Sequence, residues 1–384
     1  MKYLEVFLVA LRLGCTSFGG PTAHLGYFYD EYVKRRKWLT EQQYTNLVAL
    51  CQFLPGPASS QVGFGIGITK AGLLGGVISF IGFTLPSVIV LMLCATLLLA
   101  YSSDLGWTHG LKLVAVAIVL NAIIGMGKKL LPDVKTKLLA LFTLVMAVTV
   151  IHPMSQLGAL IIVALAGLIL FKENDESKPS IKIFNIPKLV GVIALSLFFS
   201  FLLILPIINF FTSNSWVSMI DHFYRSGALV FGGGHVVLPL LEQAFVATDM
   251  ISANDFLTGY ALTQAVPGPL FTFAAYIGTV MSGIPGGIVA TIAIFLPAFL
   301  LLIGVLPFWE HVQSNRYAKA MLKAVSAGVV GILIAALYDP IFTSSVNSHM
   351  DFAFAAILFV LLAYCKAPSW LIVILGLALG IMFY

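Results

Sequence analysis

The chain has 384 residues, of which 60% are hydrophobic and 10% are charged, and its formal net charge is +5. Soluble domains carry about 25% charged residues, so this composition excludes an ordinary soluble protein and indicates one that folds within a lipid bilayer. The basic residues lie in short loops beside apolar runs, which argues against a nucleic-acid-binding surface.

The first predicted element is an apolar run over residues 3–20 that contains Arg12 and ends in Phe18-Gly19-Gly20-Pro21. Glycine lets the chain turn and brings bare backbone amides close to a ligand. A helix that restarts after such a break offers free N–H groups and the positive end of its dipole, which attract anions. The alternative is a tight helix crossing, which small residues also permit. The same pattern recurs as Phe231-Gly232-Gly233.

The second predicted element, residues 42–68, is interrupted by QFLPGP at residues 52–57. Pro55 and Pro57 each remove a backbone donor, which is costly in lipid because lipid offers no replacement hydrogen bond. The amide of Gln52 can donate to a substrate or satisfy carbonyls that the prolines leave unpaired, and both uses remain open. Ser59, Ser60 and Gln61 follow the break as further donors.

The other predicted apolar stretches lie on both sides of one polar segment. In the first half they cover residues 73–101, 108–127, 137–151 and 155–171. A polar linker over 172–188 and one long apolar run over 189–211 follow. In the second half the stretches cover 216–240, 255–281, 284–308, 319–338, 351–364 and 368–384. The last two of each half are short for a span, which needs about 20 residues.

The two halves are copies of one another. Residues match in order at a spacing of about 212 along the chain. The matched sets are Arg12 with Arg225, Gly19-Gly20 with Gly232-Gly233, Gln52 with Gln264, and Pro55-Gly56-Pro57 with Pro267-Gly268-Pro269. The predicted organisation is a transporter repeat over 1–171, a linker with a connecting transmembrane helix over 172–212, and a second repeat over 213–384.

An all-α polytopic membrane protein with an inverted-topology repeat is the predicted fold class. One extra crossing between the halves turns the second copy upside down, as in many secondary transporters. If residues 3–33 and 41–69 are full spans, the basic cluster KRRK at 34–37 falls outside, against the positive-inside rule. Re-entrant hairpins that turn at the Gly-Gly and Pro-Gly-Pro breaks remove this conflict, so we favour them over full spans.

Several charged and polar residues are candidates for chemistry in the membrane. Arg12 and Arg225 lie within apolar runs, where a charge costs at least about 2.5–3.5 kcal/mol, and guanidinium groups bind oxyanions through paired donors. The alternatives are a snorkelling Arg12 and a helical ion pair of Arg225 with Asp221. Titratable groups could couple transport to protons. The proton-coupling candidates are His24, His235, Glu242 and Glu5.

Enzyme and metal signatures are missing from the sequence. It contains no HExxH, GxSxG or Walker motif, and the four cysteines have no metal-like spacing. We therefore expect neither an enzyme nor a metal or cofactor site.

The motifs FGGP, KRRKWLTEQQ, QFLPGP, FGGGHVVLP and QAVPGP together resemble those of the chromate ion transporter family, in its long, fused two-domain form. The resemblance covers nearly the whole chain. It implies a chromate exporter driven by the proton motive force. It assigns functional positions to Arg12, Gly19, Gly20, Pro55, Gly56, Pro57, Arg225, Gly232, Gly233, Pro267, Gly268 and Pro269. Sulfate, a similar tetrahedral dianion, is an expected relative or competitor of chromate.

The functional prediction is a multi-pass secondary transporter in the cytoplasmic membrane. Its expected partners are a chromate- or sulfate-like oxyanion and the lipid bilayer, with a homodimer as an option and no nucleic acid. Its substrate-binding set is Arg12, Gly19, Gly20, Gln52, Ser59, Arg225, Gly232, Gly233 and Gln264. Two alternatives are a transporter or flippase of a lipid-linked phosphate, since hairpins and arginine also suit a phosphate head group, and a membrane-embedded enzyme.

Overall fold

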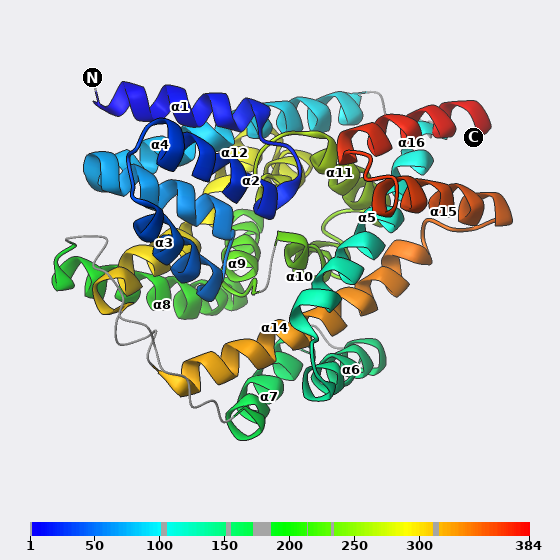
Figure 1. Ribbon diagram of the computed structural model, residues 1–384. Helices are drawn as coiled ribbons and strands as arrows, with labels where there is room; N and C mark the ends of the chain where they lie inside the picture. Colours follow the sequence, from blue (N-terminus) through cyan, green and yellow to red (C-terminus); the bar gives the residue numbers. More distant parts are fainter. Residues whose placement is uncertain are drawn as a thin grey trace. The chain divides into compact units, whose positions relative to one another are not determined.

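The described part of the chain is helical, with no strand among residues 2–100, 106–150, 155–171, 186–212, 214–231, 234–309 and 315–384 of the computed structural model (Figure 1). In the first half the elements are α1 (Lys2–Thr16), α2 (Gly20–Phe28), the π-helix η1 (Tyr29–Arg35), α3 (Glu41–Phe53), α4 (Ala58–Ala100), α5 (Gly106–Leu130), α6 (Val134–Thr149) and α7 (Ser155–Leu170). The connecting helix is α8 (Lys188–Phe211).

The second half repeats this order of elements. They are α9 (Ser215–Ala228), η2 (Gly234–Val236), α10 (Val237–Leu241), the π-helix η3 (Glu242–Val246), α11 (Ala253–Ala265), η4 (Leu270–Thr272), α12 (Phe273–Val305), η5 (Leu306–Phe308), α14 (Arg316–Ala336), the π-helix η6 (Leu337–Phe342), α15 (His349–Ala363) and α16 (Ser369–Phe383). In each half a π-helix follows the Gly-Gly break, and the Pro-Gly-Pro break separates two helices.

The first break reverses the direction of the chain. α1 ends at Thr16 and α2 begins at Gly20. Close to the turn, Arg12 of α1 bonds to Glu31 of η1, and farther from the turn Glu5 bonds to Arg36. The earlier residue of α1, Glu5, pairs with the later residue of the second arm, Arg36, so the two arms run antiparallel. The chain therefore forms the hairpin that the glycine pair predicts.

The second break makes a further hairpin. The side chain of Leu47 in α3 lies against Gly65 in the first leg of α4. α4 then bends at Gly72, whose φ is 71°, and the bend brings the backbones of Gly67 and Gly75 together. α12 bends in the same way at Gly283, with φ 66°. Each bend falls between two of the predicted apolar stretches, 42–68 and 73–101 in the first half and 255–281 and 284–308 in the second.

The second legs of α4 and α12 pack against each other in opposite directions. The rings of Phe80 and Phe295 have centroids 4.9 Å apart, and farther along α4 Met92 approaches Gly287, which is earlier in α12. Equivalent segments of the two halves are therefore antiparallel where they meet, which is the relation that an inverted repeat predicts.

Among the described residues, five helices are long and apolar enough to cross a membrane: Ala58–Leu99, Gly106–Leu130, Lys188–Phe211, Leu270–Phe308 and Arg316–Phe342. The third is the connecting crossing that the sequence predicts. α6 and α7 have 16 residues each, and α15 and α16 have 15, so the last pair of each half is short, as expected. The protein is an all-α polytopic membrane protein.

Two compact units divide the chain differently from the repeats. The first consists of Met1–Thr96, Asp175–Gly234 and Pro267–Asn315, and the second of Leu97–Asn174, His235–Val266 and Arg316–Tyr384. Each unit therefore takes segments from both predicted repeats. In the second unit, small residues let helices approach closely: Thr143 of α6 donates a 2.6 Å hydrogen bond to the carbonyl of Gly328 in α14.

Candidate functional site

Both Pro-Gly-Pro breaks lie in the first unit, where each contacts the Gly-Gly region of the other half. The amide of Gly56 donates to the carbonyl of Val230 at 2.7 Å, and the amide of Gly268 donates to the carbonyl of Ser17 at 3.0 Å. Val230 and Ser17 directly precede Phe231 and Phe18 of the two Phe-Gly-Gly motifs. The four breaks that the sequence singles out therefore belong to one reciprocal arrangement.

Glycine is required at the centre of each Pro-Gly-Pro break. Gly56 has φ 115° and Gly268 has φ 111°, which residues with a side chain rarely adopt. A Cβ at Gly56 would lie 2.7 Å from Cβ of Ala298, and a Cβ at Gly268 would lie 2.9 Å from Oγ of Ser87. Ser87 and Ala298 occupy equivalent positions in the two halves, so the close packing is reciprocal as well.

The first break leaves free donors at the start of α4. Gln61 is the first residue of this helix whose amide bonds back, to the carbonyl of Pro57 at 3.0 Å. The amides of residues 58–60 precede that first helical bond, and the helix dipole adds positive charge at the same end. Such an end binds anions.

Buried hydroxyl and imidazole groups surround this helix end. His24 is fully buried, with Nδ1 3.3 Å from Oγ of Ser59 and Nε2 3.2 Å from the carbonyl of Ser17. A carbonyl only accepts, so Nε2 carries a proton, and in the neutral ring Nδ1 accepts the hydroxyl hydrogen of Ser59. His24, predicted for proton coupling, and Ser59, predicted for substrate binding, are thus brought together.

Several buried polar atoms in this unit have no hydrogen-bond partner. They include Oγ of Ser17, Oγ of Ser60, Oε1 of Gln61 and Oγ1 of Thr84. Leaving a buried polar group unsatisfied costs about 1–3 kcal/mol. The hydroxyls among them can each donate to an oxygen-rich ligand, which makes this the best candidate site for an anion.

Gln61, rather than Gln52, bonds to the carbonyls around the first break. Its Nε2 donates to the carbonyls of Pro55 at 3.0 Å and Ala298 at 3.1 Å. Gln52 is exposed on α3. In the second unit, Nε2 of Gln264 is buried without a hydrogen-bond partner. Of the two uses predicted for Gln52 and Gln264, the satisfying of freed carbonyls is met instead by Gln61, four residues after Pro57.

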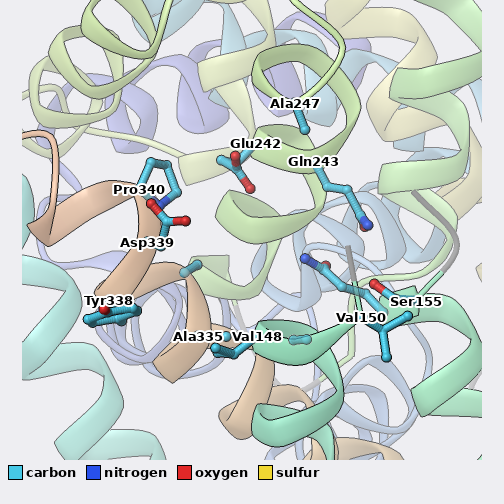
Figure 2. A pocket seen from close by; sticks show the side chains of 13 residues that line it. Val148, Val150, Ser155, Glu242, Gln243, Ala247, Ala335, Tyr338, Asp339 and Pro340 are labelled. Atoms are coloured by element: carbon cyan, nitrogen blue, oxygen red, sulfur yellow. The ribbon is translucent and has the colours of Figure 1, made fainter. Parts of the chain in front are cut away.

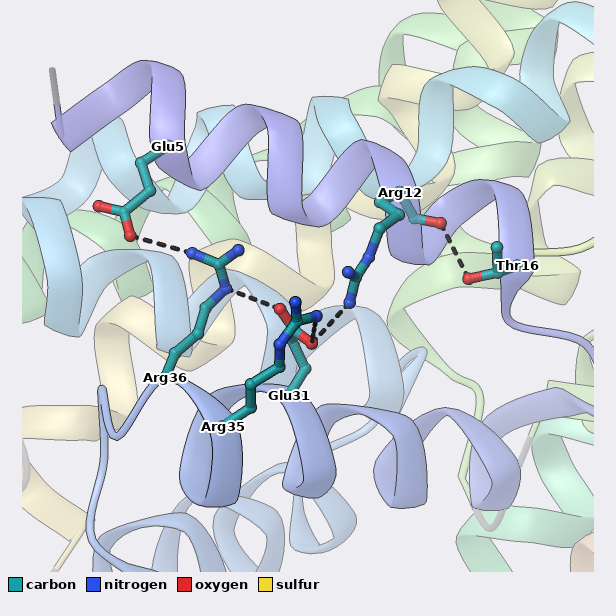
Figure 3. A network of polar contacts seen from close by, with 6 residues as sticks. All are labelled: Glu5, Arg12, Thr16, Glu31, Arg35 and Arg36. Atoms are coloured by element: carbon teal, nitrogen blue, oxygen red, sulfur yellow. Dashed lines mark hydrogen bonds and ion pairs between the residues drawn. The ribbon is translucent and has the colours of Figure 1, made fainter.

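Arg12 belongs to a network of charges between the two arms of the first hairpin (Figure 3). Figure 3 shows Arg12, Arg35 and Arg36 converging on Glu31, with N–O distances of 2.6, 3.2 and 2.7 Å. The Arg12 side chain is half exposed whereas Glu31 is buried. Glu5, a proton-coupling candidate, pairs instead with Arg36 at 3.1 Å. Arg12 therefore has a carboxylate partner that the sequence reasoning did not assign.

Arg225 forms the helical ion pair that the sequence left open as an alternative. Its Nε and Nη2 donate to Asp221 at 2.8 and 2.6 Å, and Nδ2 of Asn209 in α8 donates to the same carboxylate at 3.1 Å. Asp221 is fully buried. The paired donors of Arg225 therefore face a carboxylate, and anion binding by either arginine remains a prediction.

The other predicted residues are placed as follows. Gly19 and Gly20 have φ 100° and 77° and begin α2, and the space beside Gly20 is open. Gly232 and Gly233 lie outside the described residues. In the second unit, Nδ1 of His235 is 3.0 Å from the hydroxyl of Tyr260, and Glu242 begins η3.

Sequence reasoning missed Ser17 and Thr84 as site residues. Ser17 directly precedes the first Phe-Gly-Gly motif, and Thr84 lies two residues before Pro86, which matches Pro297 of the second half. Polar residues beside a repeated break were the signal that could have identified them.

The comparisons with known proteins agree on one family. The chromate transporter profile matches residues 4–171 and 217–381. A chromate transport protein of Pseudomonas aeruginosa is 27% identical over 88% of this chain and 81% of its own length. A probable chromate transport protein of Synechococcus elongatus is 29% identical over 85% of this chain and 81% of its own length.

The similarity to an uncharacterized transporter of Methanocaldococcus jannaschii extends over more of the sequence, with 29% identity over 98% of this chain and 93% of the relative. No solved structure matches the chain. Both matched regions of the family profile contain one Gly-Gly and one Pro-Gly-Pro break, and together they cover most of the 384 residues. The chain therefore belongs to the chromate transporter family.

Proposed function

We propose that the protein exports chromate, or a similar tetrahedral oxyanion such as sulfate, across the cytoplasmic membrane by alternating access driven by the proton motive force. The observation that carries this proposal is the cluster of free amides and unpaired buried hydroxyls where α4 begins, beside Ser59 and Ser60. Relatives named as chromate transport proteins support the choice of anion.

A tetrahedral dianion suits the chemistry of this cluster. It has several oxygen acceptors and no hydrogen to donate, whereas the start of α4 offers N–H groups and hydroxyls that donate. Hydrogen bonds to a charged group contribute about 1.5–3 kcal/mol each, so a few such donors suffice for selective binding. The prolines fix bends in the backbone that place these donors within the membrane, and they do not contact the anion themselves.

The test is uptake of radiolabelled chromate into inside-out vesicles, with excess unlabelled sulfate as competitor. Export predicts accumulation that depends on an imposed proton gradient and that sulfate reduces. Uptake indistinguishable from vesicles lacking the protein would refute the proposal. Translocation of a lipid-linked phosphate by the same vesicles, without chromate uptake, would favour the flippase alternative.

The contribution of Arg225 needs a variant that separates anion binding from folding. Arg225→Ala leaves the buried carboxylate of Asp221 without its main partner, which costs about 3–5 kcal/mol and would reduce transport through misfolding alone. The double variant Asp221→Asn with Arg225→Gln removes both charges together. If Arg225 binds the anion, this double variant inserts normally but loses transport; retained transport would show that the pair is structural.

A further inference from the structure

A cavity with several polar groups in its lining lies in the second unit. It has a volume of about 460 Å³ and is lined by the ends of α6 and α14, the start of α7, and the π-helices η3 and η6 (Figure 2). Its lining side chains include two carboxylates, Glu242 and Asp339, and two amides, Gln156 and Gln243. Among the lining residues that the structure describes there is no lysine, arginine or histidine.

Glu242 and Asp339 lie at the same side of this cavity in Figure 2. Glu242 is the first residue of η3, and Asp339 interrupts the helical geometry of η6 with φ −133° and ψ 123°. The hydroxyl of Thr343 donates to Oδ1 of Asp339 at 2.8 Å, which holds this carboxylate as an acceptor. The two acidic groups therefore share one cavity, and no basic side chain is among its described lining residues.

Burial, and after it the negative charge of Asp339, raises the pKa of the Glu242 carboxyl to about 7. Glu242 lies outside the five helices that are long enough to span a membrane. The other described polar groups that line the cavity are the phenol of Tyr338, the hydroxyl of Ser155 and the two amides, none of which supplies a positive charge. Oε1 of Gln156 is buried without a hydrogen-bond partner and can accept from a protonated carboxyl.

We propose that Glu242 and Asp339 form the proton carrier of the transporter, with one exchangeable proton held on Glu242 in this cavity. This inference rests on the proposed function, and it identifies the residues through which transport would depend on protons. The step is a reversible ionisation: the Glu242 O–H bond breaks, the proton leaves to water, and the carboxylate stays beside Asp339. Asp339 is a positioning residue, since its charge favours the protonated form of Glu242.

Protonation is tested without transport, by a carbodiimide that reacts with protonated carboxyl groups in apolar surroundings. In the purified full-length protein, mass spectrometry should find the adduct on Glu242 at neutral pH and its loss at alkaline pH. Asp339→Asn keeps an acceptor for Thr343 but removes the charge, so it should lower the midpoint of this titration. A midpoint unmoved in Asp339→Asn, or no adduct on Glu242 at any pH, would overturn the proposal.

Coupling is tested in proteoliposomes by two assays of labelled chromate. Glu242→Gln should retain exchange of labelled for unlabelled chromate but lose accumulation driven by a proton gradient by about tenfold or more. Asp30→Asn, which removes an exposed carboxylate paired with Lys34, is the matched control and should retain both activities. Loss of both activities in Glu242→Gln, or retention of both, contradicts a carrier role. Absence of exchange in the unmodified protein would instead refute chromate transport, and the carbodiimide titration would still decide the protonation of Glu242.

Discussion

The two Pro-Gly-Pro breaks share a backbone geometry but differ in chemistry. Gly56 and Gly268 have φ angles within a few degrees of each other and make equivalent hydrogen bonds to the opposite half. After the first break the chain reads Ala-Ser-Ser-Gln, whereas after the second it reads Leu-Phe-Thr-Phe. Both copies therefore have the bend, whereas only the first copy has the run of polar donors after it.

This difference teaches that the bend and the binding chemistry are separable. Thr272, the equivalent of Ser60, directs its hydroxyl to the carbonyl of Pro269 at 2.6 Å, so it serves the local backbone. Ser60 has no such partner. We therefore expect substitutions of the bend to affect both halves alike and substitutions of the donors to affect the first half alone.

The largest effect is expected for Gly56→Val and Gly268→Val. Each introduces a side chain at a positive φ, which costs roughly 1–3 kcal/mol, and forces it against Ala298 or Ser87, which costs about 1–3 kcal/mol more. Thermal unfolding in detergent should show a large loss of stability in both. Gly125→Ala, at a helical glycine with open space around it, is the control and should be tolerated. If one break tolerates valine and the other does not, the geometric equivalence is wrong.

The second prediction concerns the unpaired donor Ser60. Ser60→Ala should weaken chromate binding by about tenfold or more, because a hydrogen bond to a charged group contributes about 1.5–3 kcal/mol. Thr272→Ser keeps its bond to Pro269 and should leave binding unchanged. Binding can be measured by competition with labelled chromate. Equal losses in the two halves would show that the site is not confined to the first break.

The third prediction separates two glutamines that the sequence presents alike. Gln61→Met removes two hydrogen bonds to carbonyls and should destabilise the protein by about 1–3 kcal/mol. Gln52→Met changes an exposed position and should stay within about 0.5 kcal/mol. Thermal unfolding of the two variants side by side measures the difference. Comparable losses of stability in the two variants would show that Gln52 has a structural role as well.

The sequence predicts the fold further than it predicts the site. Spacing between repeated Arg, Gly and Pro residues identifies the two halves and their breaks because breaks depend on local residue types. Partners across the fold are different, since Glu31 is adjacent to Arg12 in space but 19 residues away in sequence. Local spacing likewise marked the Asp221–Arg225 pair as a possibility, yet the burial of Asp221 and its bond to Asn209 depend on packing with α8.

The smallest effect is expected at Glu31, which lies between the two arms of the first hairpin. Burial favours the neutral acid, but hydrogen bonds from Arg36 and Arg35 and the charge of Arg12 outweigh it and lower the pKa of Glu31. A lowered pKa in the folded state contributes stability above the unfolded pKa, and this contribution is lost as pH falls through the folded value.

Glu31→Gln should therefore remove part of the stability at neutral pH and flatten its decline towards acid. Arg12 and Arg35 are at least half exposed, so each of their pairs contributes no more than about 1 kcal/mol. Melting temperatures in detergent at neutral and acidic pH measure the change. The second half offers the contrast, because Asp221→Asn affects a buried carboxylate with a single arginine and should lose more at neutral pH. A smaller loss for Asp221→Asn than for Glu31→Gln would mean that the number of arginines, rather than burial, sets the strength of these ion pairs.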